Sequence, residues 1–156
     1  MKRLFVAAVA TLGALASLPA AAQFQKPEDA IKYRQSALTV MGNHVSRIGA
    51  MAAEKAPFDA KAAAESAHIV VTLSKLPFTA FGAGTDKGLP NRAKPEIWSQ
   101  TAKFNAAADA MAVEVAKLEV AAKGGSLDAI KTAMGGVGKS CKSCHDDFRA
   151  EKYSAN

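Results

Sequence analysis

The residues in this sequence most suited to chemistry are two cysteines and a histidine close to the C-terminus. Cys141 and Cys144 are three positions apart and His145 follows directly, within the stretch KSCKSCHDDFR. A Cys-x-x-Cys-His run can act as a redox dithiol, as part of a zinc site, or as the point where two thiols attach haem covalently and the imidazole binds its iron. Each of these three chemistries requires different ligands or secondary structure near the two cysteines.

The zinc and dithiol interpretations lack support elsewhere in the chain. A structural zinc site needs four ligands, and the sequence has no further cysteine and only His44 and His68 as additional histidines. A reactive dithiol lies at the N-terminus of a helix that follows a strand, where the helix dipole lowers the thiol pKa, whereas no strand pattern precedes Cys141. A disulfide between the two cysteines would close too short a loop to restrict the unfolded chain. We therefore expect covalent haem attachment.

The N-terminus predicts export to the periplasm. Two basic residues precede an apolar stretch from Leu4 to Leu18, and small residues up to Ala22 complete the pattern of a signal peptide that is cleaved after Ala22. The apolar stretch is too short for a membrane span, so we expect no membrane insertion. Residues 1–22 should be removed and residues 23–156 should form one domain. Export agrees with haem attachment, which takes place outside the bacterial cytoplasm.

The composition favours a helical protein without a strongly charged partner. Removal of 22 residues from the 156 leaves 134 and takes away Lys2 and Arg3, so the formal net charge falls from +6 to +4. A charge this modest points to no particular partner, and we expect no binding to nucleic acid. Alanine is abundant, and glycine and proline cluster between long stretches that contain neither.

Apolar residues recur at steps of three and four along four segments, which predicts four amphipathic helices. Pro27 suits a first helical turn, and Asp59 and Ser126 suit N-caps. Short first and third connections predict an all-α fold, an antiparallel up-down-up-down four-helix bundle. The second connection, 77–94, is unusually long and should carry or cover a functional surface. The expected helices span residues 27–53, 60–76, 95–122 and 126–148.

The fourth helix should aim the cysteines at the core. Cys141 and Cys144 continue an apolar face that runs from Leu127 to Phe148 in steps of three and four. Residues three and four apart share one side of a helix. The two thiols can therefore add across the two vinyl groups of a porphyrin while the imidazole of His145 reaches the iron.

Four stretches make the chain resemble the cytochromes c′, the class II c-type cytochromes, along nearly its whole mature length. They are QFQKPEDAIKYRQSALTVM, LSKLPFTAFGAGT, RAKPEIWS and VGKSCKSCHDDFRAEK, in the order of the family. The resemblance implies a homodimer of four-helix bundles. Each bundle would carry one haem c bound through Cys141 and Cys144, with His145 as the only protein ligand to a five-coordinate, high-spin iron.

The resemblance also assigns roles around the haem. It implies that Leu38 caps the empty sixth position, that Arg34 and Gln35 contact the haem propionates, and that Arg149 lies on the proximal face. Leucine donates no hydrogen bond, and bound dioxygen needs a donor while NO and CO do not. We therefore expect a gas-binding haem protein, not an enzyme, that binds NO and CO and buffers nitric oxide, and that could also transfer electrons to an unidentified redox partner.

Met41 supports an alternative. It lies about one turn beyond Leu38 on the same face, and a methionine thioether is a good sixth ligand for a c-type haem. The low-spin cytochromes c556 use a methionine of the first helix in this way and carry electrons. The register places Leu38 over the iron, which leaves Met41 as ordinary core filling.

Overall fold

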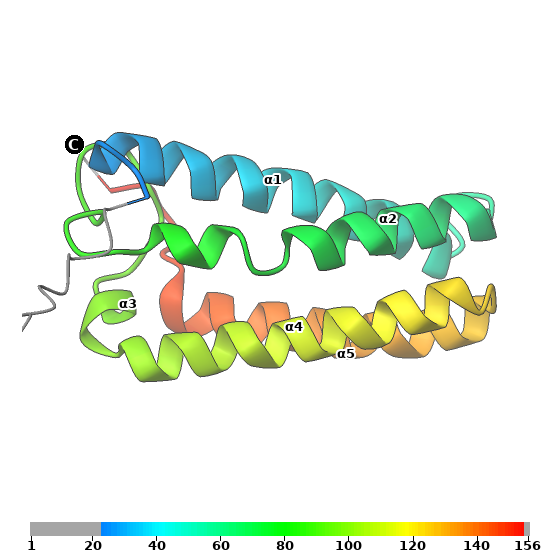
Figure 1. Ribbon diagram of the computed structural model, residues 1–156. Coiled ribbons are helices and arrows are strands. Elements are labelled where there is room, and N and C mark those ends of the chain that lie inside the picture. The colour runs from blue at the N-terminus through cyan, green and yellow to red at the C-terminus, as the bar shows by residue number, and fades with distance from the viewer. Residues whose placement is uncertain (1–22, 155–156) are drawn as a thin grey trace, which may run out of the picture.

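The computed structural model describes residues 23–154, which form a bundle of helices (Figure 1). The pair α1 and α2 lies over the pair α4 and α5, and successive long helices run in opposite directions. The predicted antiparallel four-helix bundle is thus confirmed, while the predicted signal peptide lies outside the described residues. The elements are α1 Pro27–Ala52, α2 Ala60–Leu73, the 3₁₀ helix η1 Pro77–Ala80, α3 Glu96–Ser99, α4 Thr101–Lys123 and α5 Leu127–Phe148.

Three helices begin as the sequence predicts. Pro27 opens α1, followed by two acidic residues that complement the positive end of the helix dipole. The Asp59 carboxylate accepts a hydrogen bond from the Ala62 amide at 3.0 Å, and the Ser126 hydroxyl accepts one from the Ala129 amide at 3.3 Å. Both side chains satisfy amide groups that have no partner inside the helix, which fixes the starts of α2 and α5.

The second helix is shorter than predicted. It ends at Leu73 instead of continuing to residue 76. Both the backbone amide and the hydroxyl of Ser74 donate to the Val71 carbonyl, at 3.1 and 2.8 Å. Pro77 has no amide hydrogen to donate to the Leu73 carbonyl. The last turn therefore tightens and passes directly into η1.

The third predicted helix is in fact two helices. Residues 95–122 were expected to be continuous, but Gln100, with φ −124° and ψ 44°, separates α3 from α4. The Trp98 indole donates to the Gly82 carbonyl at 3.0 Å, and the Thr101 hydroxyl donates to the Trp98 carbonyl at 3.1 Å. The second bond occupies an acceptor that a continuous helix would use for its own backbone. α3 is thus turned towards the long connection.

The core contains two clusters of different character. Most of the bundle interior is aliphatic, and its members include fully buried Ile48, Val70, Leu118 and Val137. Near the end of α5 the core becomes aromatic, and Phe104 packs edge-to-face on Phe148 with ring centroids 5.2 Å apart. Partly buried residues at the edge of this aromatic cluster include Phe78, Phe81, Trp98 and Cys144.

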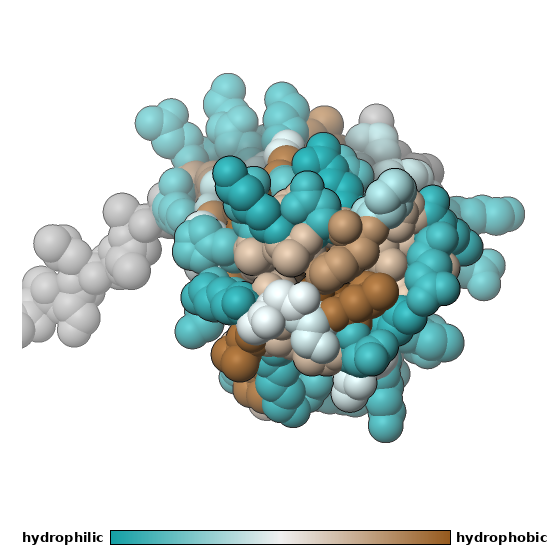
Figure 2. Space-filling view, turned by 90° about the vertical axis from the view of Figure 1, so that its right-hand side faces the viewer, coloured by the Kyte–Doolittle hydropathy of each residue, from teal (hydrophilic) through white to brown (hydrophobic). Residues whose placement is uncertain are grey.

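The two ends of the bundle differ in how the chain turns. The start of α1, the end of α5, α3 and the long connection 81–95 all lie at the left-hand end in Figure 1. The short connections after α1 and α4 lie at the other end, which faces the viewer in Figure 2. Within residues 23–154, no helix has the length and hydrophobicity that crossing a membrane would require.

Candidate functional site

Cys141 and Cys144 lie on one face of the last turns of α5 as free, partly buried thiols. Cys141 packs at the edge of the aliphatic cluster and Cys144 at the edge of the aromatic cluster, so the pair marks the boundary between the two. Burial raises the pKa of both thiols; the charges of Cys141 and Asp147 raise that of Cys144 further, and a hydrogen bond from Ser140 partly offsets the effect at Cys141. Both thiols are therefore protonated at neutral pH.

His145 is exposed beside this pair, in the last turn of α5. Desolvation by the surrounding protein lowers its pKa, and the positive charges of Arg149 and Arg92 lower it further, against a smaller opposite effect of Asp146. An imidazole that stays neutral keeps its lone pair free to bind a metal ion. Binding of an iron by His145 stays a prediction.

Arg149 ends α5 and lies outside the helix. Its backbone is extended, with φ −115° and ψ 122°, and its amide donates to the His145 carbonyl at 3.0 Å. It pairs with Ala93 in an isolated antiparallel bridge. The predicted position one turn after His145 is thus present, but a backbone bridge to the long connection, not helix geometry, sets the direction of Arg149.

Leu38 and Met41 differ in how deeply their side chains are buried. Met41 is 7% exposed and belongs to the buried aliphatic cluster, whereas Leu38 is only partly buried and packs on the edge of that cluster. An edge side chain can face a bound group, while Met41 is already surrounded by core residues. The placement favours Leu38 over Met41 as the residue that faces a haem bound at Cys141 and Cys144.

Arg34 is the largest fully buried side chain of the described residues, at 2% exposure. Its two terminal nitrogens donate to the Ala80 carbonyl at 2.9 Å, the Thr85 hydroxyl at 3.0 Å and the Thr85 carbonyl at 2.8 Å. Its guanidinium carbon lies 4.3 Å from the centre of the Phe81 ring. Burial lowers the pKa of Arg34 to about 10, against the opposing charge of Asp86, so the group remains a cation at neutral pH.

These hydrogen bonds show that Arg34 stabilises the fold, in addition to its predicted contact with the haem propionates. Three of its five N–H groups already hold the segment 80–85 against α1. Gln35 does the same further along the connection, since its amide donates to the Pro90 carbonyl at 3.0 Å. Contact of either side chain with haem propionates stays a prediction.

Arg92 is a residue that the sequence did not assign to the site. Its Nε donates to the Ala150 carbonyl at 2.6 Å, and its charge acts on His145 together with that of Arg149. No sequence periodicity places residue 92 beside residue 145, because the contact depends on how the long connection folds back. The only local signal is the Pro-Asn pair before it, which is typical of a turn.

The remaining histidines do not join this group. His44 is partly buried on α1 and lies 3.3 Å from the Ser66 hydroxyl, and exposed His68 lies 2.9 Å from the Glu119 carboxylate. Within residues 23–154, no three His, Cys, Asp or Glu side chains are grouped closely enough to hold a metal ion. Neither histidine is therefore grouped with Cys141, Cys144 and His145.

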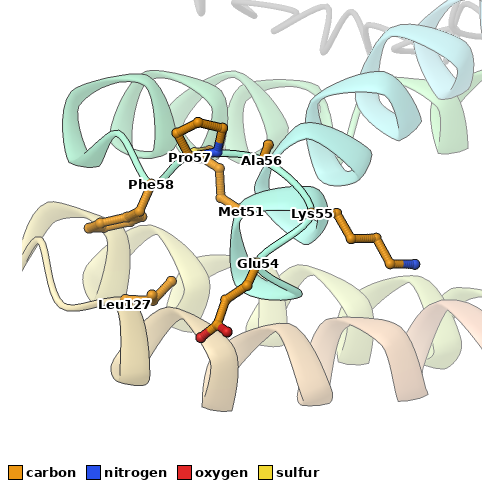
Figure 3. Close-up of a pocket in the computed structure, with 7 residues that line it drawn as sticks. All are labelled: Met51, Glu54, Lys55, Ala56, Pro57, Phe58 and Leu127. Atoms are coloured by element: carbon orange, nitrogen blue, oxygen red, sulfur yellow. The ribbon is translucent and has the colours of Figure 1, made fainter.

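An apolar groove is present at the opposite end of the bundle. Figure 2 shows hydrophobic surface at this end, and Figure 3 shows Phe58 and Leu127 facing each other across the groove, with Met51 behind them and Lys55 pointing away. Leu127 begins α5, and at 1.5 Å per residue it lies about 21 Å along the helix from Cys141. The groove is therefore separate from the cysteine and histidine group.

Comparison with known proteins identifies the family of this chain. The family model described as cytochrome c′ matches residues 29–149, which include most of α1, all of α5 and the Cys-x-x-Cys-His run. This chain belongs to the cytochrome c′ family. Its cofactor is accordingly haem c, which the family carries in covalent attachment.

Similar sequences have the same description. The cytochrome c′ of Rubrivivax gelatinosus is 59% identical over 127 residues, which cover 81% of this chain and 98% of the relative. The cytochrome c′ of Alcaligenes xylosoxydans xylosoxydans is 47% identical over 130 residues, covering 83% of this chain and 100% of the relative. These extents confirm the resemblance found from the four sequence stretches.

Solved structures of the family share the fold. The crystal structure of the Rubrivivax gelatinosus cytochrome c′ superimposes with a TM-score of 0.79 at 59% identity, covering 81% of this chain and 99% of that one. A nitric oxide complex of a variant cytochrome c prime from Alcaligenes xylosoxidans gives a TM-score of 0.77 at 45% identity, covering 83% and 100%. The bundle described here is therefore the family's own architecture.

Proposed function

We propose that this chain is a periplasmic cytochrome c′ that binds nitric oxide and carbon monoxide and buffers nitric oxide. Haem c would be attached through the thiols of Cys141 and Cys144, with His145 as its only protein ligand. Haem iron that has one protein ligand supplies an open position for a diatomic gas. The observation that carries the proposal is the placement of two partly buried thiols and an adjacent imidazole in the last turns of α5, where Cys141 packs on the same aliphatic cluster as the partly buried Leu38.

The residues present fit a haem at this place. Leu38, Phe78, Cys141 and Cys144 continue the apolar faces of their elements, yet they are only partly buried, unlike residues deeper in the bundle such as Val137. The chain's own packing thus leaves apolar surface beside the two thiols. A porphyrin ring needs such surface, because its faces are apolar while its propionates are charged.

Leu38 would select the ligand. Its side chain offers neither a lone pair for iron nor a hydrogen-bond donor, so it stabilises no charge on bound dioxygen. Nitric oxide and carbon monoxide need no such donor. A nitric oxide complex solved for a variant of the Alcaligenes xylosoxidans relative supports gas binding by this family.

The proposal extends to assembly and place in the cell. The family resemblance supports a homodimer, and the pattern of residues 1–22 supports export followed by cleavage after Ala22. Sedimentation equilibrium of the purified holoprotein should give twice the mature mass. N-terminal sequencing of protein from the periplasmic fraction should begin at Gln23.

Mass spectrometry and a pyridine haemochrome assay test the attachment. The holoprotein should carry one haem per chain that stays bound after denaturation, because thioether bonds survive unfolding. Replacement of both Cys141 and Cys144 by serine should give a chain that loses haem on denaturation, because serine forms no thioether bond. A colourless wild-type product from cells with haem-maturation machinery would reject the proposal.

A low-spin electron carrier is the second candidate. A relative called cytochrome c-554 from Cereibacter sphaeroides is 29% identical over 148 residues, covering 92% of this chain and 96% of the relative. In this candidate Met41 would bind the iron as a sixth ligand. The 7% exposure of Met41 within the aliphatic cluster counts against it.

A further inference from the structure

The long connection is joined to the C-terminal tail along several residues. The Lys94 amide donates to the Phe148 carbonyl at 3.0 Å, and the Ala150 amide donates to the Arg92 carbonyl at 2.7 Å. Further along, the Ser154 amide donates to the carbonyl of residue 91 at 2.8 Å. Segments 91–94 and 148–154 therefore form a short backbone pairing directly after the end of α5.

The Arg92 side chain reinforces this pairing. Its Nε donates to the Ala150 carbonyl at 2.6 Å, while the Ala150 amide donates to the Arg92 carbonyl. The guanidinium carbon also lies 5.9 Å from the centre of the Tyr153 ring. The Arg92 side chain thus contacts the tail at two residues, Ala150 and Tyr153.

The connection itself is held firmly at this point. Asn91 is 3% exposed, its Nδ2 donates to the Asp86 and Leu89 carbonyls at 3.2 and 3.1 Å, and its Oδ1 accepts from the Ala93 amide at 3.0 Å. From the other side, Gln35 of α1 donates to the Pro90 carbonyl. The residues on the N-terminal side of Arg92 are therefore held by hydrogen bonds within the connection and to α1.

The end of α5 consequently has two guanidinium groups. Arg149 follows His145 by one turn, and the backbone pairing with the tail brings Arg92 to the same end of the helix. Among the ion pairs formed within residues 23–154, none includes either arginine. Neither guanidinium therefore has a direct counter-ion among the described residues, and physiological salt screens such charges over roughly 8 Å.

We propose that Arg92 is a positioning residue of the proximal side, where it clamps the tail that carries Arg149 and supplies a second positive charge that favours reduced over oxidised iron. The proposal rests on the proposed haem attachment at Cys141, Cys144 and His145. A nearby positive charge stabilises the ferrous state, which has one positive charge fewer than the ferric state. The long connection between η1 and α3 would thereby support the haem site.

Two substitutions separate the clamp from the charge. In Arg92→Gln, the amide nitrogen is as many bonds from the backbone as the arginine Nε, so it can still donate to the Ala150 carbonyl, but the charge is gone. In Arg92→Lys, the charge remains and a methylene replaces the Nε donor. Lys87→Gln is the matched control, since it neutralises an exposed cation of the same connection.

The holoproteins are compared by spectroelectrochemistry and by hydrogen exchange of the Ala150 amide. Arg92→Gln should lower the reduction potential by clearly more than Lys87→Gln does, while the Ala150 amide keeps its protection. Arg92→Lys should keep the potential and lose protection at Ala150 by about tenfold or more, as expected for loss of about 1.4 kcal/mol of local stability. Arg92→Met provides a second neutral variant if the glutamine variant does not fold.

A potential in Arg92→Gln that moves no further than in Lys87→Gln would overturn the role of the charge. Unchanged protection of Ala150 in Arg92→Lys would overturn the clamp. Failure of the underlying haem assignment is recognised separately, because the wild-type chain would then contain no covalently bound haem. The exchange measurement would still test the clamp in that case.

Discussion

Leu38 of α1 and Cys141 of α5 pack against the same aliphatic cluster, and both lie at its edge with their side chains only partly buried. The two residues come from neighbouring helices at opposite ends of the described chain. We propose that a haem attached to Cys141 also meets Leu38. In this proposal Cys141 attaches the haem and Leu38 selects the gas that binds to its iron.

Replacing Leu38 by alanine should speed gas binding. In the proposed site the leucine would have to move aside before NO or CO reaches the iron, so its removal should raise both association rates, by about tenfold for each 1.4 kcal/mol that the movement costs. Stopped-flow mixing of the ferrous protein measures these rates. Val40→Ala, at an exposed position of the same helix, should leave them unchanged, and unchanged rates in Leu38→Ala would show that Leu38 is not the gate.

Replacing Met41 by leucine should leave the iron coordination as it is. Met41 fills the aliphatic cluster, and a leucine of similar volume should cost less than about 1.5 kcal/mol of stability. Absorption spectroscopy and denaturant unfolding measure the two effects. A change from low-spin to high-spin iron in this variant would instead identify Met41 as the sixth ligand and support the electron-carrier candidate.

Replacing Arg149 by alanine should affect the later steps of nitric oxide binding. Arg149 lies just beyond His145 and is directed by its bridge to Ala93, so it can influence the proximal side but not the first approach of gas past Leu38. Formation or decay of the final NO complex should change more than the initial association rate. Equal changes in both rates would remove the proximal role of Arg149.

Replacing Arg34 by methionine should destabilise the whole protein. The variant loses three buried hydrogen bonds and leaves two backbone carbonyls of the 80–85 segment without their partner, a loss of about 3 kcal/mol. Urea unfolding followed by circular dichroism measures it. Arg47→Met, an exposed arginine on the same helix, should change stability by less than about 0.5 kcal/mol; similar losses in the two variants would contradict the structural role of Arg34.

The thiols should react slowly in haem-free protein that retains its helices. Burial raises the pKa of Cys141 and Cys144 in the folded state, so at pH 8 less thiolate is present than in the unfolded chain. Because the unfolded chain loses these protons first, the folded state should lose stability as pH rises above about 9, the ordinary pKa. Alkylation by iodoacetamide should be slower without urea than with it, and the reverse order would be inconsistent with buried thiols.

Sequence patterns predicted the elements whose causes are local. The caps at Asp59 and Ser126 and the spacing of apolar residues along α1 and α5 depend on neighbours within one or two helical turns. The break at Gln100 could not be predicted in this way, because it depends on the contact of Trp98 with Gly82. The cysteines and histidine were recognisable from their spacing, since attachment chemistry fixes it.

The proposed role of Arg92 could not be predicted from the sequence for a related reason. Its approach to the end of α5 results from backbone hydrogen bonds between segments 91–94 and 148–154, and backbone pairing of irregular segments leaves no periodic side-chain pattern. Contact of Arg34 with the haem propionates stays a prediction, and its packing on Phe81 and its bonds to Thr85 became apparent only from the fold.

The absorption spectrum of the ferrous protein at neutral pH, recorded before and after addition of nitric oxide, tests the central claim most directly. A haem held by His145 alone beneath Leu38 predicts a five-coordinate, high-spin spectrum that changes on addition of NO. A six-coordinate, low-spin spectrum before any gas is added would contradict this account.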